Sequence, residues 1–426
     1  MDSTTFLVIA VIAIVAQSFL LFLALFEPGL DYKISTPPSA SLDSPDFLRT
    51  LEALTDSRLT RRSSIIVLTN GDVYFKAELE AIRVAEHSIN LEAYIFQKGK
   101  VADQFLEALT ERARAGVRVN LVLDAIGSFA SWNSYFKDFY AAGGRVAWYH
   151  PFRWQTLARI NNRTHRELII IDGRVGFIGG SGVADHWLYP KPGHARWRDT
   201  MFRVEGEAVT QLQATFAENW LEASGEILTE HDYFPLCEDD EQTPALVVNS
   251  SPSAGRSTRA RILYQMLLAS AKESILVTTP YFLPDRSARA EMVRALAERG
   301  VRVEIIVPGK NSDHLLTRRS SRRLYGDLLK AGAKIYEYEP AMIHTKSLVI
   351  DGEWSVAGTT NFDNRSFGLN DEVNLAALDR DLALRLTEDF ERDRAASHAV
   401  SYTQWRRRSV FERVHELFGW LLERQQ

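Results

Sequence analysis

The sequence of 426 residues contains one cysteine, Cys237. A single thiol cannot form an intrachain disulfide and cannot build a cysteine-based metal site, so both are excluded. An excess of positive charge is also missing, because the formal net charge is -5. Nucleic acid is therefore not an expected partner of this chain.

No lysine or arginine precedes the longest apolar run, which extends from Phe6 to Phe26 and is interrupted only by Gln17 and Ser18. A helix over these 21 residues would span roughly 30 Å, the thickness of a bilayer core. A cleaved signal peptide would carry a basic start and a shorter apolar stretch. We therefore predict an uncleaved transmembrane anchor, and the basic residues that follow it favour a cytoplasmic catalytic portion.

The chain is too long for one ordinary core, and a comparison of the sequence with itself divides it into two similar halves. Four segments recur in the same order, with offsets of 184 to 189 residues for three of them and 179 residues for the fourth. The pairs are HSINLEAYIF (87–96) with ESILVTTPYF (273–282), ERARAGVRVNLVL (111–123) with ALAERGVRVEIIV (295–307), AGGRVAWYHP (142–151) with AGAKIYEYEP (331–340), and THRELIIIDG (164–173) with IHTKSLVIDG (343–352). The halves are interpreted as a duplicated domain.

Within each half, amphipathic segments alternate with short apolar runs. Lys76–Glu86 and Gln104–Arg114 have helical periodicity, and each is followed by a run typical of a buried strand. This alternation predicts an α/β fold with a mostly parallel or mixed sheet covered by helices. The predicted segments are an anchor (6–26), a linker (27–62), domain 1 (63–236), an acidic linker (237–244), domain 2 (245–400) and an amphipathic C-terminal helix (401–426).

The second half carries the motif HTKSLVIDGEWSVAGTTN, which supplies His344, Lys346, Asp351, Thr359 and Asn361. Residues i and i+2 of a strand face the same side, so the imidazole and the ammonium can address one bound group. An imidazole is a nucleophile or general acid near neutral pH, and an ammonium stabilises phosphate oxygens. The combination favours phosphoryl transfer without a metal or another cofactor.

The pattern HxKxxxxD followed by GTxN is similar to the signature of the phospholipase D superfamily. The resemblance covers about residues 63 to 416, and three longer segments resemble bacterial cardiolipin synthases: TTPYFLPD (278–285), SSRRLYGDLLKAGAKIYEY (320–338) and WRDTMFRVEGEAV (197–209). It implies duplicated domains, each a mixed β-sheet flanked by helices, whose motifs meet at a pseudo-twofold axis. It also implies an inner-membrane enzyme that acts on phospholipids such as phosphatidylglycerol.

Carried onto this chain, the resemblance implies that His165 attacks phosphorus to form a phosphohistidine and that His344 protonates the departing alcohol. Asp172 and Asp351 are implied as supporting catalytic residues behind the two histidines. Thr359 and Asn361 are implied at the substrate, and Glu372 resembles a family position near the site. Oligomeric state is not implied.

The first half departs from the family pattern at two positions. Glu167 occupies the place of the motif lysine, and Gly182 in the loop GGSG occupies the place of Asn361. A bare carboxylate facing phosphate would repel it by roughly 4 kcal/mol at 4 Å and an effective dielectric of about 20. Glu167 is therefore expected to turn toward a cation, to be protonated, or to act as a base. The candidate cations are Arg163, Arg166 and Arg198.

Three further expectations concern polar or amphipathic residues. Glu92 either orients a motif histidine or forms a surface salt bridge, and Arg198 with Asp199 is expected to form an internal ion pair. At the C-terminus, an apolar helix face follows three arginines and would either lie on an anionic bilayer or pack on the core. That face consists of Phe411, Val414, Phe418, Leu421 and Leu422.

The leading functional hypothesis is transfer of a phosphatidyl group between phospholipids, which yields cardiolipin and glycerol. A phospholipase D hydrolase that uses water is the nearest alternative, because the phosphohistidine step is shared. A non-catalytic lipid-binding scaffold with a degenerate first motif is the alternative from another class. A nuclease is disfavoured because it would need a basic groove along the nucleic-acid backbone.

Overall fold

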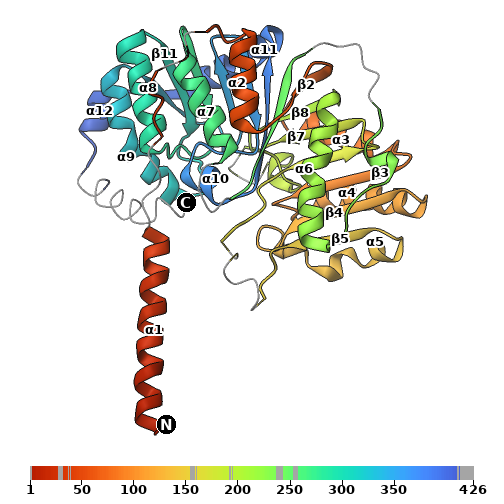
Figure 1. The fold of residues 1–426 in the computed structure, drawn as a ribbon. Helices are drawn as coiled ribbons and strands as arrows, with labels where there is room; N and C mark the ends of the chain where they lie inside the picture. The colour runs from red at the N-terminus through yellow and green to blue at the C-terminus, as the bar shows by residue number, and fades with distance from the viewer. Residues whose placement is uncertain are drawn as a thin grey trace.

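The computed structural model describes residues 2–26, 32–36, 38, 40–153, 159, 161–190, 193, 195–236, 243–252, 258–409 and 412. Helix α1 (Ser3–Phe26) leaves the body of the molecule as a single rod (Figure 1). Its side chains Phe6, Leu7 and Ile12 are more than 60% exposed. Among the residues described, no helix meets the length and apolarity required to cross a membrane.

The first half is built on a seven-stranded sheet in the order β2-β8-β7-β6-β3-β4-β5. The neighbours β3, β4 and β5 run parallel, and the other pairs are antiparallel. Every residue of β3 is buried, as expected for a central strand covered on both faces. The strands are β2 (Ser63–Thr69), β3 (Ser88–Ala93), β4 (Arg118–Asp124), β5 (Arg145–Tyr149), β6 (Leu168–Ile171), β7 (Val175–Gly179) and β8 (Thr200–Gly206).

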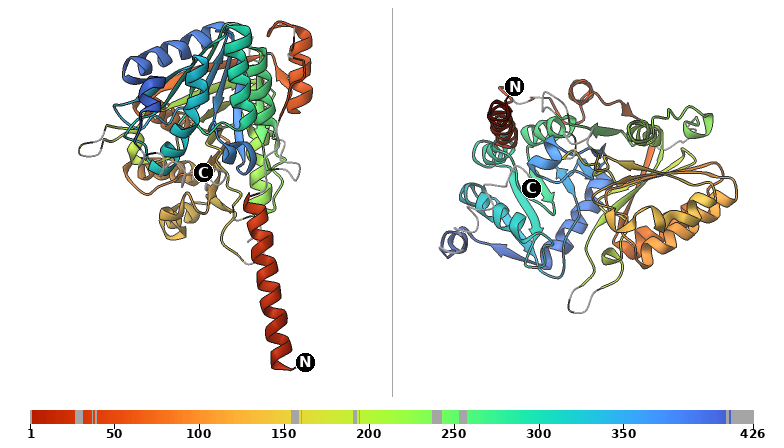
Figure 2. Two further views of the ribbon diagram at one scale, coloured as in Figure 1. Left: turned by 90° about the vertical axis from the view of Figure 1, so that its left-hand side faces the viewer. Right: turned by 90° about the horizontal axis from the view of Figure 1, so that it is seen from below.

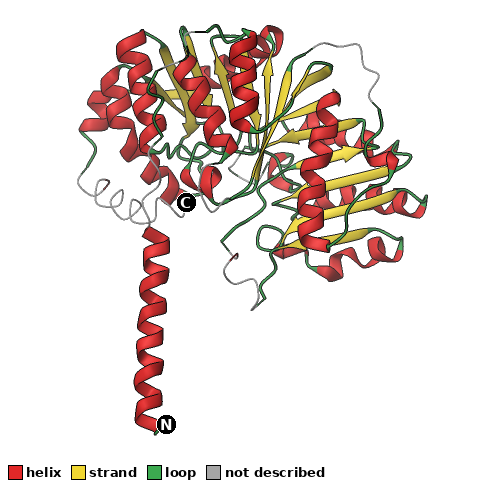
Figure 3. Cartoon of the chain, viewed as in Figure 1, coloured by secondary structure: helices red, strands yellow, loops and turns green. Residues whose placement is uncertain are grey.

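The second half repeats this sheet strand for strand. Its order is β1-β9-β15-β14-β13-β10-β11-β12-β16, so the inner seven strands reproduce the first sheet and one short strand is added at each edge. Figure 3 shows strands and helices in both halves of the molecule. The strands are β1 (Leu59–Thr60), β9 (Ala245–Ser250), β10 (Ser274–Thr278), β11 (Arg302–Pro308), β12 (Lys334–Tyr338), β13 (Ser347–Ile350), β14 (Trp354–Gly358), β15 (Glu372–Leu378) and β16 (Ser397–Val400). The matching order establishes the duplicated α/β fold with mixed sheets.

Helices cover the outer faces of both sheets and also lie between them. Helices α6 (Glu207–Ser224) and α11 (Arg380–Ala395) contribute to a central core that contains strand residues of both halves. The outer helices are α3 (Gly71–Arg83), α4 (Lys100–Arg114) and α5 (Lys137–Ala141) in the first half, with α2 (Pro45–Thr55), α7 (Arg259–Ser270), α8 (Arg286–Arg299), α9 (Leu315–Ala331), α10 (Asn364–Gly368) and α12 (Tyr402–Arg406) in the second. Helices were predicted at 76–86 and 104–114; α3 and α4 lie there but begin four to five residues earlier.

The segment 27–62, predicted as a linker, instead contributes structure to the second half. Ser44 caps α2 by accepting a hydrogen bond from Phe47 N–H at 3.2 Å, and Phe47 and Leu51 join the core formed by α7 and α8. Strand β1 then pairs with β9. The prediction was wrong because the apolar face of α2 is short and was not recognised as a helix.

Two predicted segments fall largely outside the described residues. In the acidic linker 237–244, only residues 243 and 244 are described. In the C-terminal segment 401–426, the described part contains α12, and the predicted apolar face lies outside it.

We predict that Leu51→Ala lowers the stability of the second half by about 2–5 kcal/mol, because Leu51 is fully buried in its core. The measurement is the urea midpoint of the purified protein. Leu54→Ala on the same helix is the matched control, because Leu54 is 47% exposed. Equal midpoints for the two variants would contradict the assignment of α2 to the core.

Candidate active site

The backbone of each motif histidine is hydrogen-bonded to the opposite half of the molecule, next to an isolated parallel β-bridge. His165 N–H donates to the carbonyl of Asp371 at 2.9 Å, in the bridge that joins Thr164 to Asp371. His344 N–H donates to the carbonyl of Arg198 at 2.7 Å, in the bridge that joins Arg198 to Ile343. The two histidines therefore lie where the halves meet.

The side chain of each motif histidine also contacts a carboxylate of the opposite half. His165 Nδ1 lies 3.0 Å from both carboxylate oxygens of Glu372, and His344 Nδ1 lies 2.9 Å from Asp199 Oδ2. Both carboxylates are fully buried. A carboxylate that accepts from Nδ1–H fixes the tautomer and leaves Nε2 as the reactive nitrogen. Each half thus supplies one histidine and orients the histidine of the other.

The ionisation of His344 and Asp199 depends on burial and on neighbouring charges. Burial and then the Lys346 ammonium lower the pKa of His344, although Asp199 opposes this. Lys346 Nζ lies 3.0 Å from His344 Nδ1 and 3.3 Å from its Nε2. Burial opposes ionisation of Asp199, but the hydrogen bond and charge of His344, the charge of Lys346 and the Thr200 amide together lower the pKa of that carboxyl. A Cβ added to Gly180 would lie 2.9 Å from Lys346 Nζ, so the ammonium sits against the GGSG loop.

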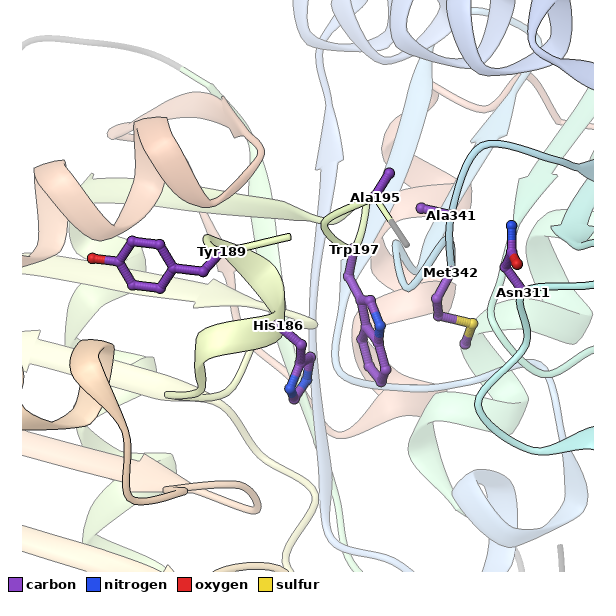
Figure 4. Close-up of a pocket in the computed structure, with 7 residues that line it drawn as sticks. All are labelled: His186, Tyr189, Ala195, Trp197, Asn311, Ala341 and Met342. Atoms are coloured by element: carbon purple, nitrogen blue, oxygen red, sulfur yellow. The ribbon is translucent and has the colours of Figure 1, made fainter. Parts of the chain in front are cut away.

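Aromatic rings pack against both histidines. Tyr94 meets His165 edge-on at 5.5 Å between ring centroids, and Trp187, Trp197 and Tyr281 surround His344 at 5.5, 5.3 and 6.4 Å. A pocket of about 140 Å³ lies beside this wall at the junction of the halves (Figure 4). It is lined by His186, Tyr189, Ala195 and Trp197 of the first half and by Asn311, Ala341 and Met342 of the second.

Two further residues of the second motif lie at the centre. Thr359 Oγ1 donates to Glu372 Oε2 at 2.6 Å, so this hydroxyl orients the carboxylate that holds His165. Asn361 is buried, and its Oδ1 has no hydrogen-bond partner among the described residues. A buried amide oxygen without a partner is costly unless a bound molecule satisfies it, which favours a substrate contact for Asn361.

The aspartates of both motifs do not reach the histidines. Asp172 accepts backbone hydrogen bonds from Glu86, His87 and Ser88 at 2.7–2.9 Å, at the far end of β6 from His165. Asp351 accepts the equivalent bonds from residues 272–274 at 2.8 Å. Their implied catalytic role is corrected: each carboxylate anchors the start of a central strand to the turn after the motif strand.

Glu167 is held by backbone amides. Its Oε1 accepts from Tyr94 N–H at 3.2 Å and Ile95 N–H at 3.3 Å, and burial raises the pKa of this carboxyl well above its usual range. Of the three alternatives expected for Glu167, pairing with one of the candidate arginines does not occur. Arg163, Arg166 and Arg198 pair instead with Asp124, Glu218 and Asp393, respectively.

The two departures of the first motif form one structural unit. A Cβ at Gly182 would lie 3.0 Å from Glu167 Oε1 and 2.6 Å from the carbonyl oxygen of Ile95, so a side chain such as asparagine does not fit there. In the second sheet, strand register aligns Pro280 with Tyr94. Proline has no N–H, so the second half cannot offer the same cradle to a carboxyl.

Sequence reasoning missed Asp199 as a site residue and left Glu92 open between orienting a motif histidine and forming a surface salt bridge. Asp199 was expected to pair with the Arg198 side chain, but that guanidinium binds Asp393. Alignment of the equivalent strands β8 and β15 would have identified it, because Asp199 and Glu372 occupy matching positions beside them. Glu92 is buried rather than on the surface, and burial raises its pKa to about 7; it accepts from Thr164 Oγ1 at 2.5 Å, next to His165.

A buried site with two histidines, each held by a carboxylate of the opposite half, defines a duplicated phosphotransfer enzyme. The family profile described as "Cardiolipin synthase, PLD-like domain" matches residues 79–220 and 264–394. The chain is 37% identical over 363 residues to the cardiolipin synthase of Geobacillus kaustophilus (strain HTA426), covering 84% of this chain and 72% of that protein. It is 33% identical over 386 residues to the major cardiolipin synthase ClsA of Bacillus subtilis (strain 168), covering 90% and 80%.

The chain therefore belongs to the phospholipase D-like cardiolipin synthase family, and it is a phosphatidyltransferase of the phospholipase D type. Solved structures support the fold. Phosphatidylserine synthase of Haemophilus influenzae Rd KW20 superposes with a TM-score of 0.66 at 14% identity, covering 89% of this chain and 99% of that one. Polyphosphate kinase of Porphyromonas gingivalis gives a TM-score of 0.54 at 12% identity, covering 89% and 54%.

We predict that substitution of Asp199 lowers activity, whereas substitution of Asp172 lowers stability. Asp199→Asn removes the carboxylate that holds His344, so the turnover number falls by about 100- to 10,000-fold while the protein stays folded. Asp172→Asn weakens the strand anchor and lowers stability by about 1–3 kcal/mol. Lipid turnover and thermal melting are measured for both. A folded Asp172→Asn protein with as little activity as Asp199→Asn would restore Asp172 to the site.

We predict that Glu167→Gln keeps activity within about threefold, because a glutamine oxygen accepts the same two amide hydrogen bonds as a protonated glutamate. Glu167→Lys leaves those amides unpaired and buries a second ammonium near Lys346, so stability falls by about 2–4 kcal/mol. Initial rates and urea midpoints report the two effects. A 100-fold loss in the glutamine variant would mean that Glu167 acts as an ionised base.

Proposed function

We propose that the protein transfers a phosphatidyl group from one phosphatidylglycerol molecule to a hydroxyl of another, giving cardiolipin and glycerol. The observation that carries the proposal is the crossed pair of histidine–carboxylate contacts, His165 with Glu372 and His344 with Asp199. Relatives that are named cardiolipin synthases support the substrate class. Two oriented imidazoles are what a double displacement at phosphorus requires.

In the first step, His165 Nε2 attacks phosphorus and the bond to the glycerol headgroup oxygen breaks. His344 enters this step protonated on both ring nitrogens and gives its Nε2 proton to that oxygen. In the second step, His344 takes a proton from the acceptor hydroxyl. The acceptor oxygen attacks phosphorus and the phosphorus–nitrogen bond breaks, which restores both histidines. Lys346 would hold the phosphate oxygens during both steps, and Asn361 Oδ1 would accept a hydrogen bond from a substrate hydroxyl.

The asymmetry of the site supports this division of roles. Burial and the neighbouring Lys346 lower the pKa of His344, which favours release of its proton to the leaving oxygen once the ring is protonated. Glu167 occupies the equivalent position beside His165 and brings no cation there. His165 is also the more accessible ring, at 13% against 7% for His344, as suits the group that makes the covalent bond.

Helix α1 is the proposed membrane anchor, with the catalytic halves on the cytoplasmic side of the inner membrane. The apolar run Phe6 to Phe26 and the high exposure of the apolar side chains described on α1 support this assignment. Such a rod would be unfavourable in water because it exposes apolar surface on all sides.

The test is to incubate the purified protein with phosphatidylglycerol vesicles and to follow lipid products by mass spectrometry. Cardiolipin is expected from the wild type and is expected to be lost in His165→Ala and His344→Ala. With donor labelled at phosphorus and rapid acid-free quenching, the wild type is expected to carry label on His165, whereas His165→Ala stays unlabelled. Phosphatidic acid as the product would establish a hydrolase, and label on His344 would reverse the two roles.

A further inference from the structure

An exposed apolar surface lies at one end of the first half. It consists of Ile126, Phe129, Trp132 and Phe152, which we call the aromatic rim. Their exposed fractions are 53%, 73%, 43% and 75%. Ile126, Phe129 and Trp132 follow β4, and Phe152 follows its neighbour β5, so all four extend from adjacent parallel strands.

Packing and hydrogen bonds hold the rim in place. Trp132 stacks on Trp148 at 4.5 Å between ring centroids, and Trp148 Nε1 donates to Asn133 Oδ1 at 2.7 Å. The underlying segment forms two 3-10 turns, η1 (Phe129–Ser131) and η2 (Asn133–Phe136). Apolar rings that a rigid scaffold presents to solvent usually mark an interaction surface.

The rim is connected to the catalytic centre. Ser128, next to Phe129, donates its hydroxyl to the Tyr94 carbonyl at 2.9 Å and accepts from Phe96 N–H at 2.9 Å. Tyr94 is the ring that contacts His165, and its N–H binds Glu167. The rim therefore lies at the same strand ends as the first half-site.

The rim also lies on the side of the molecule from which α1 departs. In Figure 1, α1 runs downward, and β5 and α5 lie in the lower part of the first half. Figure 2 gives the same arrangement after a quarter turn. The part of the first half that carries the rim thus lies on the side from which α1 departs.

We propose that the aromatic rim inserts into the headgroup region of a phospholipid bilayer and turns the His165 half-site toward the membrane surface. This proposal rests on the proposed function and adds a second membrane contact beside α1. Aromatic rings are favoured at the membrane interface, and a bilayer is a partner that matches several rings in one direction.

Charge adds little to this contact. Lys98, Lys137 and Arg153 lie in the segments beside the rim, and Asp103 and Asp138 in the same segments partly offset their charge. Insertion of the rings should therefore dominate, and binding through the rim should change little with salt.

The test uses the full-length double variant Phe129→Ser/Phe152→Ser. Its rate on phosphatidylglycerol vesicles is expected to fall about tenfold or more, and its rate on a short-chain phosphatidylglycerol dissolved as monomers is expected to stay within about twofold. Leu384→Ser on α11 is the matched control, because Leu384 is 58% exposed and α11 lies at the opposite end from α1 (Figure 1). A vesicle rate equal to that of the control would overturn the proposal.

A binding measurement separates the rim from the chemistry. Tryptophan fluorescence of the reconstituted protein is quenched with brominated phosphatidylglycerol, and Trp132→Phe is expected to lose part of that quenching. Unchanged quenching would place Trp132 outside the bilayer and would overturn the proposal even if cardiolipin forms. Reduced quenching in a protein that forms no lipid product would support the rim while refuting the proposed function.

Discussion

The exchange of carboxylates between the halves is the constraint on which the site depends. His165 is oriented by Glu372 and His344 by Asp199, and the backbone bridges beside them fix the same crossing. Neither half alone contains an oriented histidine. The central core around α6 and α11 therefore matters for catalysis, because it holds the two halves together and so brings each histidine to its carboxylate. Contacts of this kind tolerate little displacement, since a buried carboxylate that loses its partner is strongly destabilising.

The duplicated fold contains two similar half-sites, and they differ in the residues beside their histidines. In the second half, Lys346 Nζ lies within hydrogen-bond distance of His344 Nδ1. Asn361 Oδ1 has no hydrogen-bond partner among the described residues. In the first half, Glu167 turns back onto the amides of Tyr94 and Ile95. Because Gly182 leaves the space that this arrangement needs, the loss of the lysine and the loss of the asparagine are one change rather than two. The first half remains complete in the elements that orient His165.

Much of the fold was predictable because the repeat is visible in the sequence, and the repeat requires two similar sheets. The histidines were predictable because their motif is local. Asp199 was not, because its partner His344 lies 145 residues away and only the packing of the halves joins them. Asp172 and Asp351 were misassigned for the opposite reason: they are close to the histidines in sequence, but an intervening strand carries each to the far end of the sheet. The burial of Glu92 and Glu167 is likewise a tertiary property.

In the proposed mechanism, access to the phosphohistidine would decide between transfer and hydrolysis. Both rings are largely buried, and Tyr94, Trp187, Trp197 and Tyr281 occupy their flanks, so bulk water has little direct approach. A second lipid arriving from a bilayer brings its hydroxyl along a different route, already concentrated and oriented at the interface. An enclosed site that faces lipid would therefore favour an alcohol over water without a specific contact to the acceptor, because proximity alone can outweigh the abundance of water.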